Sequence, residues 1–225
     1  MNPNDWKEDE GNRLTRPTTR SEKTKETNKR MSEKTILVGP CRFSYLTVFK
    51  PRKNDLNDEM EYSVRLLIPK QPNDKCADPK AVAKMIADSI KVAKDEKIPD
   101  AKVWDNPFRD GDTELDSNGE PKEPGYWYIN AKAKAEYPPD AVDAKRNKVT
   151  AEMGWQSGDW GKAVVTFYGY DNKKKGVGCG LRGIQFLYKD EALGGGGSVT
   201  HMFQEEQGDD PTAMAGDPYD PFGDE

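Results

Sequence analysis

Three segments of the chain alternate between apolar and polar residues with a period of two. The clearest runs from residue 62 to 68, where Tyr62, Val64, Leu66 and Ile68 fall on one face. Residues 126–135 and 162–170 follow the same pattern. This period is typical of strands that bury one face and leave the other in water. The chain is therefore predicted to fold around a β-sheet with one buried face.

Further strands are predicted at residues 35–49, closed by Lys50-Pro51, and at residues 177–188. Glycines interrupt the last of these, as they do at the bends of small barrels. One helix is predicted over residues 79–97, with Asp78 as its N-cap and Pro79 in its first turn. The prediction is a mainly β fold, an OB-fold-like small barrel, closed or half-closed, with one main α-helix.

The charges divide the chain into three parts. Residues 1–34 hold nine basic and seven acidic residues and few large apolar ones, which predicts a disordered polar arm. A Gly-rich linker begins at residue 194, and residues 201–225 carry eight acidic and no basic residues. The predicted domain therefore spans residues 35–193, between the arm and a disordered acidic tail at 194–225.

Catalytic and metal-binding residues are not predicted. The chain has one histidine, His201 in the tail, and three cysteines without zinc-like spacing, which are interpreted as buried thiols. Asp110, Asp112 and their neighbours lack the glycine and glutamate of a calcium loop. The glycines of residues 176–180 precede a strand rather than a helix, so a phosphate loop is disfavoured. We expect no enzyme activity, no cofactor and, since no long apolar run occurs, no membrane span.

Basic and aromatic residues are interleaved between residues 126 and 189, where eleven basic residues face six acidic ones. Single-stranded nucleic acid is bound by such a mixture, because rings stack on bases and cations follow the phosphates. The candidate binding residues from this pattern are Tyr128, Lys132, Lys134, Trp155, Tyr168, Tyr170, Lys173 and Lys174. The alternative is that the aromatic residues fill a barrel core and the lysines keep it soluble.

The tail places aromatic residues among carboxylates. Its candidate functional residues are Asp217, Tyr219, Asp220, Phe222, Asp224 and Glu225. Such a segment can mask a cationic groove of its own protein or dock a partner, whereas a plain solubility tail is the simplest alternative.

Four blocks, residues 41–51, 62–70, 126–131, and 167–172 together with 176–185, resemble a family of bacteriophage single-stranded DNA-binding proteins, long catalogued as a domain of unknown function. The resemblance implies an OB-fold that coats single-stranded DNA during phage replication. It points to Tyr45, Lys70, Tyr168, Tyr170 and Arg182 as DNA contacts, and Arg42, in the first block, is a further candidate. The acidic tip is also similar to the tails of bacterial single-stranded DNA-binding proteins, although three residues follow Pro221-Phe222 here.

The hypothesis is a non-enzymatic, sequence-tolerant single-stranded DNA-binding protein of phage replication or recombination, acting in the cytoplasm of the infected host. Its expected partners are single-stranded DNA and, through the tail, replication proteins such as a polymerase, helicase or primase. A homo-oligomer is compatible with the sequence. Two alternatives stay open: a β-rich structural module of the virion without DNA binding, and a nuclease built on the carboxylates of the acidic loop at residues 98–125.

Overall fold

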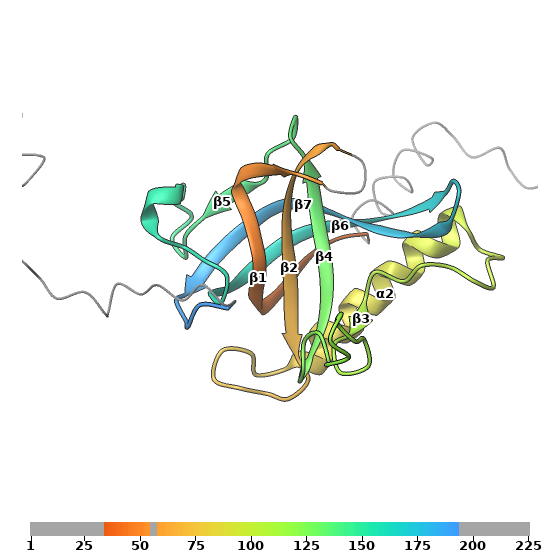
Figure 1. Cartoon of the computed structure of the whole chain (residues 1–225), viewed down its shortest axis with the longest axis horizontal. Coiled ribbons are helices and arrows are strands. Elements are labelled where there is room, and N and C mark those ends of the chain that lie inside the picture. The colour runs from red at the N-terminus through yellow and green to blue at the C-terminus, as the bar shows by residue number, and fades with distance from the viewer. Residues whose placement is uncertain (1–33, 55–57, 194–225) are drawn as a thin grey trace, which may run out of the picture. The chain divides into compact units, whose positions relative to one another are not determined.

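Five strands of the chain close into a barrel (Figure 1). The computed structural model describes residues 34–54 and 58–193. The barrel strands are β1 (Thr35–Lys53), β2 (Met60–Pro69), β4 (Tyr126–Lys134), β6 (Trp160–Asp171) and β7 (Lys175–Tyr188). They follow the order β4-β2-β1-β6-β7, with antiparallel neighbours, and a parallel pairing of Lys132 with Gly180 closes β4 onto β7. This is the predicted OB-fold.

Two short strands that the sequence did not predict lie at the ends of this order. β3 (Arg109–Asp110) pairs with β4, and β5 (Asp140–Val142) pairs in parallel with β7. Strands of two and three residues carry too few side chains to show a period, so alternation alone could not predict them.

The helix between β2 and β4 is where the sequence predicted it. α2 (Pro79–Lys97) begins after Asp78, whose side chain accepts a hydrogen bond of 3.0 Å from the backbone N–H of Ala81. It lies beside the β6–β7 hairpin (Figure 1). A Cβ on Gly169 of β6 would stand 2.8 Å from the carbonyl oxygen of Ala93, so this contact requires a glycine.

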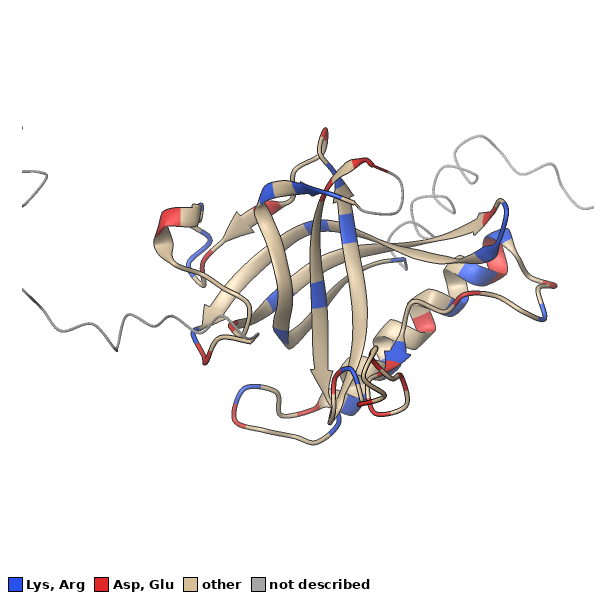
Figure 2. Cartoon of the chain, in the orientation of Figure 1, with Lys and Arg blue, Asp and Glu red and all other residues tan. Residues whose placement is uncertain are grey.

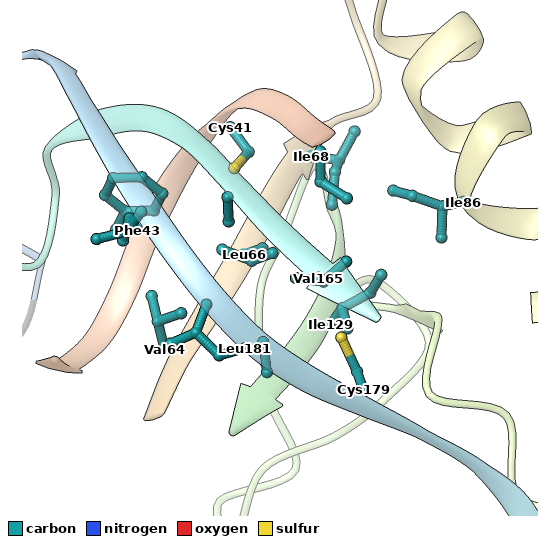
Figure 3. Packing of buried hydrophobic residues seen from close by; sticks show 14 of the residues in the cluster. Cys41, Phe43, Val64, Leu66, Ile68, Ile86, Ile129, Val165, Cys179 and Leu181 are labelled. Atoms are coloured by element: carbon teal, nitrogen blue, oxygen red, sulfur yellow. The ribbon is translucent and has the colours of Figure 1, made fainter. Parts of the chain in front are cut away.

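The inward faces of the strands and one face of α2 form a single apolar core (Figure 3). Val64, Leu66 and Ile68 are buried there, as the alternation of β2 predicted. Cys41, Cys76 and Cys179 are free and buried, which confirms their interpretation as structural thiols. Burial raises the pKa of Cys41 and Cys179, so both stay protonated near neutral pH.

β1 differs from its prediction in two respects. It continues past Pro51, because Arg52 and Lys53 pair with the first two residues of β2. Its register also shifts between Ser44 and Thr47, where Tyr45 adopts a left-handed backbone with φ of 49°. A bulge of this kind redirects a side chain, and Tyr45 stands 66% exposed on the outer surface.

The predicted linker and acidic tail lie outside the described residues, as does the predicted polar arm except for Lys34. Within residues 34–54 and 58–193, no helix is both long and apolar enough to cross a membrane.

Candidate nucleic-acid interface

Two tyrosines lie flat on the outer surface of the barrel. Tyr168 of β6 is opposite Gly178 of β7, and Tyr170 is opposite Gly176. A Cβ on Gly178 would stand 2.5 Å from Cζ of Tyr168, and one on Gly176 would stand 2.4 Å from the hydroxyl of Tyr170. Each ring therefore rests directly on the backbone of a glycine. The glycines of residues 176–180 serve this packing in a strand and form no phosphate loop.

The outer side of these rings is available to a ligand. The Tyr168 side chain is 53% exposed, although its ring contacts the strand beneath it. Tyr170 is half-buried, and its hydroxyl donates a hydrogen bond of 3.3 Å to Asp105. We call this surface, made of Tyr168, Tyr170, Lys173, Lys174 and Arg182, the open face.

Three cations of the open face make no ion pair within the described residues, although the neighbouring Lys175 pairs with Asp171 at 3.2 Å. Lys173 and Lys174 form the turn between β6 and β7, and neither makes an ion pair within the described residues. Arg182, on β7, donates a 3.4 Å hydrogen bond to the hydroxyl of Thr166, and it too makes no ion pair within the described residues. These three charges are therefore free to meet phosphates.

A second group of aromatic and basic residues lies on the outer surface of β1, β2 and β4. Arg65 is held between two rings, with its guanidinium carbon 4.6 Å from the ring centre of Tyr45 and 4.7 Å from that of Tyr128. It also donates hydrogen bonds to Asn130, at 2.9 Å, and to Glu123, at 2.7 Å. We call this surface, made of Tyr45, Arg65, Lys70, Arg109 and Tyr128, the covered face.

Carboxylates from residues 105–123 occupy the covered face. Lys70 pairs with Asp110 at 2.5 Å and with Asp112 at 2.6 Å. Arg109 pairs with Asp105 at 2.5 Å and with Glu114 at 2.6 Å. Figure 2 shows acidic residues gathered in the loops beside β3. The positive charge of this face is thus neutralised within the chain.

Tyr128 is also withdrawn from solvent by the same segment. It is 2% exposed, and its hydroxyl donates a 3.0 Å hydrogen bond to Glu114. Burial, followed by this hydrogen bond, raises its pKa. Tyr128 therefore offers no free ring face to a base while residues 105–123 keep this arrangement.

The ion pairs move the pKa of each member further from neutral pH. The hydrogen bond from Lys70 lowers the pKa of Asp110 and of Asp112, and the one from Arg109 lowers the pKa of Glu114. Desolvation acts to lower the pKa of Lys70, but its hydrogen bonds to the two aspartates outweigh that effect and raise it. All these groups are consequently charged at neutral pH.

The acidic segment is built into the sheet. Asp105 forms backbone hydrogen bonds of 2.9 and 3.0 Å with Lys175 and Val177 of β7. Four residues later, β3 pairs Arg109 with Tyr128 of β4. The segment thereby bridges β7 and β4, and the loop at residues 98–125 is a structural part of the barrel.

Four further sequence candidates lie apart from both faces or at their margins. Arg42 donates hydrogen bonds of 2.9 Å to the carbonyl oxygens of Gly158 and Glu191. Trp155 is stacked on Phe186, with ring centres 4.7 Å apart. Lys132 pairs with Glu61 at 2.7 Å, whereas Lys134 makes no ion pair within the described residues. DNA contact by these four residues stays a prediction.

Two residues that shape the site were absent from the sequence candidates. Arg65 lies on the outward face of β2, and the alternation of that strand could have identified it. Arg109 lies in the acidic loop, whose composition gave no signal of a basic residue with a structural role. The tail candidates Asp217, Tyr219, Asp220, Phe222, Asp224 and Glu225 lie outside the described residues.

Metal ligands were not expected, and the described residues contain no group of His, Cys, Asp and Glu side chains that could hold a metal ion. Asp110 and Asp112 instead bind the ammonium of Lys70.

Comparison with known proteins gives matches over most of the chain. Residues 34–213 match the family model described as Enterobacter phage Enc34, ssDNA-binding protein. Protein p50 of Acyrthosiphon pisum secondary endosymbiont phage 1 is 34% identical over 169 residues, which cover 72% of this chain and 88% of p50.

Solved structures of one phage protein share the fold. The single-stranded DNA-binding protein of bacteriophage Enc34 in complex with ssDNA is 27% identical, with a TM-score of 0.59 over 72% of this chain and 90% of that chain. A C-terminal truncation of the same protein is 26% identical, with a TM-score of 0.59 over 71% of this chain and 88% of that chain. The chain therefore belongs to the bacteriophage family of the Enc34 ssDNA-binding protein.

Proposed function

We propose that the chain is a non-enzymatic, sequence-tolerant single-stranded DNA-binding protein of phage replication or recombination. The observation that carries this proposal is the open face, where two tyrosine rings rest on glycines beside unpaired cations. The Enc34 relative, described in complex with ssDNA, supports the same function.

Binding on the open face would combine stacking with phosphate contacts. A base stacked on an exposed ring contributes ~1–3 kcal/mol and needs no particular base identity. The rings of Tyr168 and Tyr170 are two residues apart on one strand, a spacing of ~6.6 Å along β6. Successive bases of an extended strand can therefore occupy both rings, with phosphates toward Lys173, Lys174 and Arg182.

The covered face has a different role in this proposal. Its cations already bind carboxylates, so phosphates would have to displace Asp110, Asp112 and Glu114 before they could bind there. We therefore place the principal DNA path on the open face and assign Lys70 and Tyr128 to the support of the acidic segment.

In this proposal the tail regulates DNA binding or recruits partners. Residues 201–225 carry eight acidic residues and no basic ones, which suits a segment that limits access of DNA or recruits replication proteins such as a polymerase, helicase or primase. The site of action in this proposal is the cytoplasm of the infected host.

Fluorescence anisotropy of a labelled oligo(dT) tests the proposal. The full chain should bind the oligonucleotide at low salt, bind it more tightly than the matching duplex, and release it steeply as salt rises. Magnesium should cause no cleavage. A chain that ends at residue 204 should bind more tightly than the full chain if the tail limits access.

Two results would contradict these statements. Failure of both the full and the shortened chain to bind oligo(dT) at low salt would exclude DNA binding and favour a structural role. Equal affinity of the two chains would remove access control and leave the tail only the recruitment of partners.

A further inference from the structure

An apolar groove of about 410 Å³ lies on the outer surface next to the open face. Its floor consists of Leu37, Val142, Val164 and Ile184, which come from β1, β5, β6 and β7. Leu37 and Val164 are register partners and remain 48% and 36% exposed. Ile184 is 2% exposed and belongs to the core, so the part of the floor that the described chain leaves uncovered is formed by Leu37, Val164 and the half-buried Val142.

Basic side chains border this floor. Arg146, Lys162 and Arg182 line the groove, and none of them makes an ion pair within the described residues. Asp140 is the one acidic residue in the lining. Three cations against one carboxylate give the groove a net positive charge.

The turn that carries Arg146 is well organised. Asp143 Oδ1 accepts hydrogen bonds of 2.8 Å from the backbone N–H groups of Lys145 and Asn147. Arg146 itself has a left-handed backbone with φ of 68°, a conformation that a residue with a side chain rarely adopts. The side chain of Gln185 in β7 donates a 3.2 Å hydrogen bond to Asp143, which holds the turn against the strand.

The chemistry of the groove differs from that of the open face. Bases stack on aromatic rings, and the groove lining contains only aliphatic and polar residues. An aliphatic floor of this size fits one or two bulky apolar side chains of a peptide. The cationic border would then attract carboxylates that flank those side chains.

We propose that this groove docks a short acidic segment of a partner protein. A bulky apolar side chain of the segment packs on Leu37, Val142 and Val164. Its flanking carboxylates bind Arg146, Lys162 and Arg182. A second copy of the chain fits less well, because a stable interface of folded surfaces buries about 800 Å² per partner, whereas this hollow accepts only a few side chains.

Docking in the groove does not require DNA binding, but the two sites share Arg182. That residue lines the groove and also contacts Thr166, two residues before Tyr168 on β6. A docked acidic segment should therefore weaken DNA binding modestly through loss of one phosphate contact.

The test uses the full chain and a fluorescein-labelled octapeptide, in which three acidic residues flank a central Leu-Phe pair on each side. Val164→Asp should weaken peptide binding at least tenfold, because it places a carboxylate in the apolar floor. Lys162→Gln should weaken it about threefold, because it removes one cation. Val103→Asp, in an exposed loop, and Lys91→Gln, on the exposed side of α2, are the matched controls and should leave it unchanged. Oligo(dT) affinity of Val164→Asp should fall by no more than about threefold, since the new carboxylate can remove at most the one phosphate contact of Arg182.

Four outcomes would overturn the proposal. Peptide binding that ignores both groove variants would place the peptide elsewhere, and equal binding of a peptide with amides in place of its carboxylates would remove the role of the cations. An equal loss of oligo(dT) affinity in Val164→Asp would assign the groove to the DNA path. Tenfold tighter peptide binding by a chain that ends at residue 204 would assign the groove to the chain's own tail.

Discussion

The open face and the covered face contain the same kinds of side chain in different electrostatic settings. Each has tyrosines next to Lys and Arg on the outer surface of the barrel. On the open face the ring of Tyr168 is exposed and the nearby cations are unpaired. On the covered face Tyr45 is exposed, but Tyr128 is buried and Lys70 binds two carboxylates. Residue composition alone therefore does not decide which of the two can bind a polyanion.

The segment at residues 105–123 distinguishes the two faces, although its Asp105 also accepts a hydrogen bond from Tyr170 of the open face. It neutralises Lys70, Arg65 and Arg109 through five carboxylates. An intramolecular carboxylate is always present at high local concentration, so a phosphate must compete with it at an energetic disadvantage. A cation on the covered face therefore contributes less binding free energy to a DNA complex than a cation on the open face.

Removal of the exposed ring should give the largest effect. Tyr168→Ala should weaken oligo(dT) binding by roughly 5- to 140-fold, since a stacked base contributes ~1–3 kcal/mol. Fluorescence anisotropy with a labelled oligonucleotide measures the change. Tyr128→Phe should leave the affinity within twofold, because that ring is already buried beneath the acidic segment.

Tyr188→Ala is the matched control for this experiment. Tyr188 is 50% exposed and lies ten residues beyond Gly178 on β7, roughly 33 Å along the strand. If Tyr188→Ala and Tyr168→Ala weaken binding equally, the open face is not the stacking surface.

The salt dependence of binding should distinguish free cations from paired ones. Lys173→Gln combined with Lys174→Gln should lower the slope of log K against log salt by about 1.4, at ~0.7 per phosphate contact on a single strand. Lys70→Gln should leave the slope unchanged, because Asp110 and Asp112 already neutralise that cation. Titrations between 50 and 200 mM salt measure both slopes.

Lys80→Gln combined with Lys91→Gln removes the same charge from α2 and controls for the net charge of the chain. A slope that falls equally in this control and in the Lys173/Lys174 variant would indicate a general charge effect. A fall in the slope of Lys70→Gln would show that DNA reaches the covered face.

Most of the fold followed from local sequence signals. The alternation of β2, β4 and β6 predicted which faces are buried, and Asp78-Pro79 predicted the start of α2. The extension of β1 past Pro51 was missed because its cause is pairing with Met60 and Glu61 of another strand. Long-range pairing of this kind leaves no mark in the segment itself.

The site was less predictable for a similar reason. The interleaved pattern predicted Tyr128, Tyr168 and Tyr170 as DNA contacts, and the family resemblance added Lys70, with nothing in the sequence to separate these residues. Only the fold brings residues 105–123 against β4, and this contact separates Lys70 and Tyr128 from the others. The excess of basic residues between residues 126 and 189 does not include the acidic residues 105–123, which lie against the surface of β2 and β4 in the fold. The net charge of that surface therefore could not be predicted from the count.

Neutralisation of the acidic segment should make the covered face resemble the open face. Asp110→Asn combined with Asp112→Asn frees the ammonium of Lys70 and should raise oligo(dT) affinity roughly two- to fivefold at low salt, the scale of an exposed ion pair. Asp88→Asn combined with Asp95→Asn removes two exposed carboxylates from α2 and is the matched control. Equal gains in both double variants would attribute the effect to net charge and remove the special role of the segment.

Changes of pH between 8 and 5 should have the smallest effect, because the carboxylates of the covered face stay ionised and paired throughout this range. The hydrogen bond from Lys70 lowers the pKa of Asp110 and Asp112 below the ordinary value of 3.8. A lowered carboxyl pKa means that the ion pair stabilises the fold fully above that ordinary value and is lost as the pH falls through the lowered one. The backbone N–H of Gly125, which donates a 2.7 Å hydrogen bond to Asp112, is a suitable reporter. Its hydrogen-exchange protection should stay constant from pH 8 to 5 and decrease only below about 3.8. Protection that decreased between pH 8 and 6 would show that these carboxylates do not hold the segment in place.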